Sequence, residues 1–489
     1  MPKLLPFLLA VSVTASSALA QPIVQNTRLT DTVPISAPLW AAGNWGYRTA
    51  TNRYLLQTLG SGGLAVVDTT DTSNAAVVGT VTGISVKEVK VYQNYAYATT
   101  DGGPTRVIDL TVPSAPVLVS SITQGAHSLQ VDAANGRLYL NRASQNQLRI
   151  LNVAANPVSP PLIVAYPVMD IHDCAPEGNT VYLWGGSDGM CHILDVSALP
   201  TVTEIGTVAV NGGYLHSGDL YVHPNGQKVL LTCNETAGGY LKLWDVTNPA
   251  MPTFLSEWWT DLGLSIHNVY VKGAYAYVSY YADGLRILDL TNPTLPLVVG
   301  IHDPNPTNIL SPGASIFTDA WDPYPYHDAV YVDTMYDSLA GAGYPQGAYL
   351  VDFFPAFGSG CPGTAGAVPE IWWSFGPPSP GNADFAVRLE GAAPNAPAFL
   401  VLGASSTTWL GFSLPLDLSL FGGNGCTLYA SADIVLGSTT SAAGKASRSL
   451  PVPPGTPAGV LWCQWGVADL AAPNPLHFAF TKGGKLIVE

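Results

Sequence analysis

Four histidines recur in the chain near the start of predicted inner strands. His127 begins HSLQVD, His172 stands in DIHDC, and His267 begins HNVYV, while His216 in LHSGDLYV lies close to the same place. A neutral imidazole is a ligand for transition metals and a general acid or base near neutral pH. If the fold brings these positions together, the imidazoles and the carboxylate of Asp173 could bind zinc, copper, nickel or iron.

A sequence repeat supplies the elements that would position these histidines. The stretches YLKLWDVTNP (240–249) and GLRILDLTNP (284–293) are nearly the same, and the pattern occurs seven times. The steps between its acidic or amide residues are 41, 43, 43, 50, 44 and 63 residues, and those residues are Asp68, Asp109, Asn152, Asp195, Asp245, Asp289 and Asp352. A period of about 40–45 residues with four strands is typical of a β-propeller blade.

Each repeat contains signals for four strands. In the sixth copy, HNVYVKGAYAYVSYY (267–281) predicts two strands joined by a hairpin, and GLRILD predicts a third. Asp289 ends that strand, and its carboxylate can bond nearby backbone N–H groups and hold the turn before LPLVVG, the fourth strand. We therefore predict an all-β chain with a seven-bladed β-propeller over residues 21–357.

Closure of the predicted ring requires an outer strand for the last repeat. The stretch IVQNTRLTD (23–31) could supply this strand and remove an exposed sheet edge. The long step before Asp352 predicts an insertion of about 20 residues, placed around 305–314 and 336–346.

Equivalent inner-strand positions should form a ring around the central channel. Lys87 and Trp321 occupy the place of the histidines in two other repeats. Three interpretations of the ring remain open: histidines that bond a neighbouring blade's backbone, a metal or ligand site, and a catalytic site. The serines of His127-Ser128 and His216-Ser217 are adjacent to their histidines in a strand and point to the opposite face, which argues against a nucleophile–base pair. The chain has no GxSxG motif.

The segment 358–489 lacks the repeat and alternates short apolar runs with Gly- and Pro-rich turns, which predicts a C-terminal β-sandwich. It contains few titratable residues, so an attachment or accessory role is expected. Cys361 and Cys426 lie in Gly-rich turns and are the predicted disulfide; the alternative is buried free thiols.

The first 20 residues, MPKLLPFLLAVSVTASSALA, resemble a secretory signal with a basic start, an apolar run and small residues before cleavage. We expect a secreted monomer, extracellular or at the cell surface, with no membrane span in the mature chain. The formal net charge of −15 makes nucleic acid an unfavourable partner.

The repeats GLRILDLTNPTLPLVVG and LAVVDTTDTSNAAVVG resemble the LVIVD repeat, and residues 38–355 resemble the choice-of-anchor B family of secreted bacterial proteins. The family's histidine motifs fall on His127, His172 with Asp173, His216 and His267. The resemblance implies an extracellular or surface protein with no established reaction. The chain departs from familiar anchors, because it has neither an LPxTG-type signal nor a terminal apolar span followed by a basic tail.

Together these patterns predict a non-enzymatic scaffold that binds an unknown protein or glycan at the cell surface. The alternative is a metal-dependent, hydrolase-like enzyme that uses the histidine ring with a divalent transition metal as cofactor. A third possibility is carbohydrate binding through exposed Trp and Tyr rings.

Overall fold

The computed structural model describes residues 23–34, 43–101, 103–143, 146–168, 170–210, 212–260, 263–304, 317, 319–335 and 347–489. The predicted signal sequence (1–20) and the two predicted insertions (305–314 and 336–346) lie outside these residues. Within the described ranges the chain is all-β, and its helical elements are two short 3-10 turns, η2 (Thr364–Gly366) and η3 (Leu418–Phe421). No described helix is long and apolar enough to cross a membrane.

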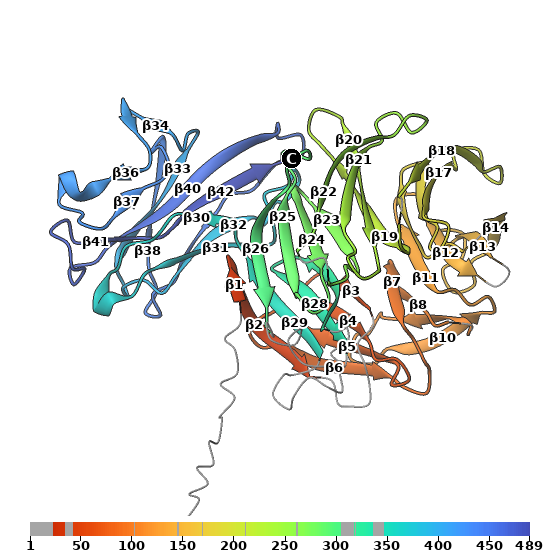
Figure 1. Ribbon diagram of the computed structural model, residues 1–489. Coiled ribbons are helices and arrows are strands. Elements are labelled where there is room, and N and C mark those ends of the chain that lie inside the picture. Colours follow the sequence, from red (N-terminus) through yellow and green to blue (C-terminus); the bar gives the residue numbers. More distant parts are fainter. Residues whose placement is uncertain are drawn as a thin grey trace, which may run out of the picture.

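Seven antiparallel sheets form between residues 44 and 353 of the described chain (Figure 1). The strands of the first four are β3 (Asn44–Arg48), β4 (Arg53–Thr58), β5 (Leu64–Asp68) and β6 (Ala76–Val81); β7 (Glu88–Tyr92), β8 (Tyr95–Thr99), β9 (Thr105–Asp109) and β10 (Val117–Ile122); β11 (Ser128–Asp132), β12 (Arg137–Ala143), β13 (Gln147–Asn152) and β14 (Leu162–Pro167); and β15 (Asp173–Glu177), β16 (Thr180–Trp184), β17 (Met190–Asp195) and β18 (Thr203–Ala209).

The last three sheets continue this order. Their strands are β19 (Leu215–Val222), β20 (Lys228–Asn234), β21 (Leu241–Asp245) and β22 (Thr253–Trp258); β23 (Val269–Lys272), β24 (Tyr275–Ser279), β25 (Leu285–Asp289) and β26 (Leu297–Asp303); and β27 (Asp319–Tyr326), β28 (Ala329–Met335) and β29 (Gly347–Phe353). Each sheet pairs its consecutive strands, as the repeat predicts.

The N-terminal segment completes the last two sheets. β2 (Thr27–Pro34) pairs antiparallel with β29, from Thr27 opposite Phe353 to Pro34 opposite Gly347. β1 (Ile23–Gln25) instead pairs with β26 of the sixth sheet. The pairing predicted for residues 23–31 is therefore present but divided between two neighbouring sheets.

The repeated Asp after the third strand holds the turn that leads to the fourth. The carboxylate of Asp68 accepts the N–H of Thr70 at 2.9 Å, and that of Asp289 accepts the N–H of Thr291 at 2.9 Å. Asp109, Asp195 and Asp245 accept the N–H two residues further on in the same way. These bonds satisfy donors that would otherwise lack partners at the strand end.

The first strands of the seven sheets contact one another in a closed circle: β3, β7, β11, β15, β19, β23, β27 and again β3. We call these sheets, with β1 and β2, the ring. Apolar side chains from adjacent sheets pack between them, as where Val66 and Leu56 share a core cluster with Ala96 and Ile108. The residues that begin the first strands therefore face a common axis.

The C-terminal part forms separate sheets. The largest has the order β30 (Ala356–Phe357), β42 (Gly483–Val488), β40 (Gly459–Ala468), β33 (Pro397–Gly403) and β38 (Ile434–Thr439), with β41 (Phe478–Phe480) also on β40. The others are β31 (Glu370–Ser374), β32 (Ala386–Glu390) and β39 (Ala446–Ser449); β34 (Thr408–Trp409) and β35 (Phe412–Ser413); and β36 (Leu416–Asp417) and β37 (Thr427–Leu428). Because β30 pairs with β42, the chain joins these sheets two residues before the predicted boundary at 358.

A disulfide joins Cys361 to Cys426, with an S–S distance of 2.09 Å. The other described cysteines, at positions 174, 191, 233 and 463, are free thiols and buried. The disulfide closes the end of the C-terminal part that contains Leu416 and Phe480 in its apolar cluster.

The C-terminal sheets lie beside the ring (Figure 1), and the two parts share one hydrophobic core. Phe353 and Tyr275 of the ring lie against Trp373, at ring-centroid distances of 5.4 Å and 6.0 Å. Arg28 on β2 reaches across the same boundary, where its guanidinium lies 2.7 Å from Asp352 and 3.0 Å from Glu390. The two parts therefore bury apolar side chains against each other.

Candidate functional site

The residues that the sequence predicts around the central channel line one small cavity at an end of the axis. Its volume is about 40 Å³, and its walls include Lys87, His127, His172, Asp173, His216, His267 and Trp321. Each of these residues lies at or near the start of a first strand. A β-bulge between Leu215 and Ser217 explains why the position of His216 along its strand differs slightly from that of the other histidines.

The four histidine rings form a continuous arc around this cavity. The centroid distances are 4.3 Å from His127 to His172, 3.8 Å from His172 to His216 and 4.2 Å from His216 to His267. Trp321 extends the arc at 3.8 Å from His267. Burial lowers the pKa of His172 and His216 well below the usual value and lowers the pKa of His267 to about 3. These three imidazoles are therefore neutral at neutral pH.

The histidines at the two ends of the arc have different partners. His127 places Nδ1 2.5 Å from Asp101 Oδ1 and Nε2 2.7 Å from His172 Nε2. The hydrogen bond with His127 lowers the pKa of Asp101 to about 2. At the other end, His267 Nδ1 lies 2.6 Å from the carbonyl oxygen of Trp321. A carbonyl only accepts, so Nδ1 donates, and in the neutral ring Nε2 holds the lone pair.

Asp173, which the sequence places beside His172, lines the cavity and is held there by hydrogen bonds. Its Oδ1 accepts the N–H of Cys174 at 2.7 Å and hydrogen bonds from Ser128 and Asn141, both at 3.2 Å. Burial raises the pKa of Asp173 to about 8. It lines the cavity but is not in the described group of residues within metal-binding reach.

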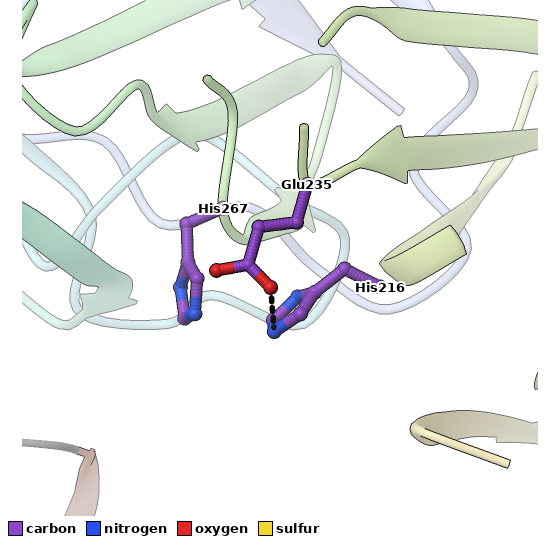
Figure 2. Close-up of side chains that lie close together, drawn as sticks. All are labelled: His216, Glu235 and His267. Carbon is purple, nitrogen blue, oxygen red and sulfur yellow. Dashed lines mark ion pairs between the residues drawn. The ribbon is translucent and has the colours of Figure 1, made fainter. Parts of the chain in front are cut away.

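That group consists of His216, Glu235 and His267, whose donor atoms all lie within 4.8 Å of one another (Figure 2). His216 Nε2 is 3.5 Å from Glu235 Oε2. The other carboxylate oxygen of Glu235 accepts a short hydrogen bond from the Tyr281 hydroxyl. Burial raises the pKa of Glu235.

Glu235 lies outside the starts of the first strands, where the repeated histidines stand, so the histidine pattern did not point to it. Glu235 follows β20, and the antiparallel register places the end of β20 beside the start of β19, with Asn234 opposite Leu215. Asp101 follows β8 in the same way and meets His127. An acidic residue just after a second strand is therefore a signal that the hairpin pattern could have provided.

Hydroxyl groups beside the histidines connect neighbouring sheets. Ser128 Oγ donates to the carbonyl of His172 at 2.6 Å, and Ser217 Oγ donates to the carbonyl of His267 at 2.7 Å. Ser279 Oγ donates to the carbonyl of Trp321 at 2.7 Å. These bonds fix the backbone from which the arc of rings projects.

The channel continues below the histidines into a second cavity of about 170 Å³, which shares Asp173 and Asn268 with the first. Lys90 is buried in the channel wall, 2.7 Å from Glu88, with its ammonium 4.5 Å from the centroid of the Trp45 ring. At this level the wall of the channel therefore contains a buried ion pair.

A family model described as the LVIVD repeat matches residues 84–124 and 265–303. These ranges contain the second and sixth sheets, including the first strands β7 and β23. The LVIVD repeat is thus present at two places in the chain. No curated protein matches the chain.

Solved structures resemble the chain at low identity. A Bacteroides fragilis protein provisionally named a 6-phosphogluconolactonase is 15% identical, with a TM-score of 0.45, over 54% of this chain and 85% of its own. BamB from Moraxella catarrhalis is 12% identical, with a TM-score of 0.41, over 64% of this chain and 85% of its own. The computationally designed Ika8 protein is 10% identical, with a TM-score of 0.41, over 69% of this chain and 98% of its own.

Proposed function

We propose that the protein is a secreted or cell-surface seven-bladed β-propeller with a C-terminal β-sandwich and acts as a non-enzymatic binding scaffold. The closed circle of first strands and the antiparallel four-stranded sheets support the propeller. The LVIVD match and the sequence resemblance to choice-of-anchor B proteins support an extracellular location. The binding face is the end of the channel that carries the histidine arc.

One observation supports the non-enzymatic part of the proposal, because it argues against a serine nucleophile. A serine that acts as a nucleophile gives its hydroxyl hydrogen bond to a base. Ser128 and Ser217 instead donate to backbone carbonyls of the next sheet. In this position the hydroxyls hold the sheets together around the axis, which is a structural role suited to a rigid binding surface.

The test is an activity and binding screen of the mature full-length chain. We expect buffer-level turnover of chromogenic ester, phosphate, glycoside and peptide substrates, both for the wild type and for the double variant His172→Ala/His267→Ala. A glycan microarray is the binding probe, and the double variant should bind it more weakly than the wild type. Turnover by the wild type that the double variant loses would replace the scaffold with the hydrolase-like alternative.

A further inference from the structure

We propose that His216, Glu235 and His267 bind a divalent first-row transition ion at the mouth of the channel, with zinc as the reference ion. Two ligands that each lie about 2.1 Å from a tetrahedral zinc are about 3.4 Å apart. The separation of His216 Nε2 and Glu235 Oε2, 3.5 Å, is close to that value. Since all three donor atoms lie within 4.8 Å, a side-chain movement of about 1 Å brings the set to tetrahedral bond lengths.

His267 already has the hydrogen bonding of a metal ligand. Its Nδ1–H donates to the carbonyl of Trp321, which leaves the lone pair on Nε2. Among the described residues no group hydrogen-bonds to Nε2, although the side chain is buried. Histidines that bind metals commonly donate their other N–H to a backbone carbonyl in this way. A buried polar atom without a partner is unfavourable, and an ion at Nε2 would satisfy it.

Glu235 is held in place by an outer hydrogen bond of its own. The hydroxyl of Tyr281 donates to Oε1, and Oε2 is the oxygen that faces His216. Tyr281 has a φ of 41°, in the left-handed region that bulky residues rarely adopt. Its ring also packs edge-on against His267 at 5.1 Å. Strained backbone of this kind concentrates at binding sites, where it fixes a side chain in one direction.

The surroundings leave room for a further donor atom. His216 and His267 line the cavity of about 40 Å³, which exceeds the roughly 10–15 Å³ needed to hold one water. Glu88, Asp173 and Asp322 line the same cavity, and Lys87 at its rim lies 3.6 Å from Asp101. Two imidazoles, one carboxylate and a free position are a donor set that zinc accepts.

This inference builds on the proposed binding function, because it takes the channel mouth as the place where a ligand meets the protein. The free position of the ion would accept a carboxylate or imidazole of a partner molecule. The two proposals can be refuted independently. Zinc binding is measured without any partner, and glycan binding is measured on both chelator-treated and zinc-loaded protein.

The experiment is a zinc titration of the chelator-treated mature full-length chain by calorimetry. We expect one zinc per chain. Glu235→Gln and His267→Gln should each weaken binding by more than the ~10–100-fold that loss of an outer-shell partner costs. The control is His192→Gln, which removes a half-buried histidine that lies 2.7 Å from Glu204 and 3.0 Å from Asp188. This control should bind zinc like the wild type.

Two results would overturn the metal site. The first is that the wild type does not bind one zinc per chain. The second is that zinc binding survives in Glu235→Gln or disappears in His192→Gln, and either outcome would indicate adventitious binding elsewhere. Glu235→Gln preserves the size of the side chain, so it carries the test if His267→Gln does not fold. Circular dichroism of each variant separates loss of binding from loss of structure.

Discussion

At the residue scale, the four histidines differ in the hydrogen-bond partners of their imidazole nitrogens. His127 is held by Asp101 and by His172, whose Nε2 lies 2.7 Å from the Nε2 of His127. His267 is held on one side only, by the carbonyl of Trp321. The arc therefore divides into a hydrogen-bonded pair and a pair that meets Glu235. Among the described residues, the second pair and Glu235 form a group of three side chains whose donor atoms all lie within 4.8 Å of one another.

Tyr281→Phe tests the outer hydrogen bond at this scale. The variant removes the hydroxyl that donates to Glu235, so zinc affinity should fall by about 10–100-fold while the fold is unchanged. Competition with a chromogenic chelator measures the affinity. Tyr97→Phe is the matched control, since it removes a buried hydroxyl that donates to the carbonyl of Pro157, far from the site. Equal zinc affinity in the two variants would argue against a positioning role for Tyr281.

The sequence predicted the histidine ring because the repeat is strong: strand period, turn residue and spacing all agree. It could not predict which histidine pairs with which partner, because that depends on the loops after second strands. Glu235 and Asp101 lie in such loops. The bulge at His216 leaves no signal in the repeat, whereas the acidic residues after the second strands could have pointed to Glu235 and Asp101.

At the element scale, β2 is the strand that closes the ring. Val33 on β2 is buried against Tyr331 and Leu350, whereas Leu29 on the same strand is 42% exposed. Val33→Asp should lower the free energy of unfolding by more than about 2 kcal/mol, because it buries a charge without a partner. Leu29→Asp should change it by no more than about 0.5 kcal/mol. Urea denaturation measures both, and equal effects would contradict the pairing of β2 with β29.

Asp219 connects the first strands of two neighbouring sheets. Its carboxylate accepts the N–H of Leu220 at 2.8 Å and the N–H of Val271, on β23, at 2.7 Å. Burial raises the pKa of Asp219 to about 6. The carboxyl group of Asp219 therefore binds a proton more tightly in the folded state than in the unfolded state. Protonation of Asp219 stabilises the fold below about pH 4, and this stabilisation is lost as the pH rises through about 6.

Asp219→Asn should remove this pH dependence. The free energy of unfolding of the wild type, compared with that of the variant, should fall by on the order of 2–3 kcal/mol between pH 4 and pH 7. Urea denaturation at pH 4, 5, 6 and 7 measures the free energy of unfolding of both proteins. Subtracting the value of the variant from that of the wild type removes the contribution of titratable groups that both proteins contain. A difference that stays constant over this range would show that Asp219 titrates normally.

At the scale of the whole molecule, the ring and the C-terminal part contact each other through polar and apolar side chains. Lys485 lies 2.7 Å from Asp289 of the sixth sheet, and the hydroxyl of Tyr221 lies 2.8 Å from the carboxylate of Glu489. These contacts join the last strand of the chain to the ring, beside the apolar core that contains Phe353 and Trp373. The sequence predicted two domains, but no local pattern in it predicted how much surface they share.

Differential scanning calorimetry tests this coupling. A shared core predicts one cooperative unfolding transition for the full-length chain, and Trp373→Ala should lower the temperature of that single transition. Leu470→Ala is the control, since Leu470 is 87% exposed and should leave the transition unchanged. Two separate transitions, of which Trp373→Ala moves only one, would mean that the parts unfold independently.

The most direct test of the central claim is anomalous diffraction at the zinc edge from crystals of the full-length chain equilibrated with zinc. We predict one anomalous peak at the channel mouth, within about 2.0–2.2 Å of nitrogens of His216 and His267 and a carboxylate oxygen of Glu235. Zinc bound elsewhere, or a channel mouth without a peak, would contradict the metal site and leave the histidine arc as a structural lining of the ring.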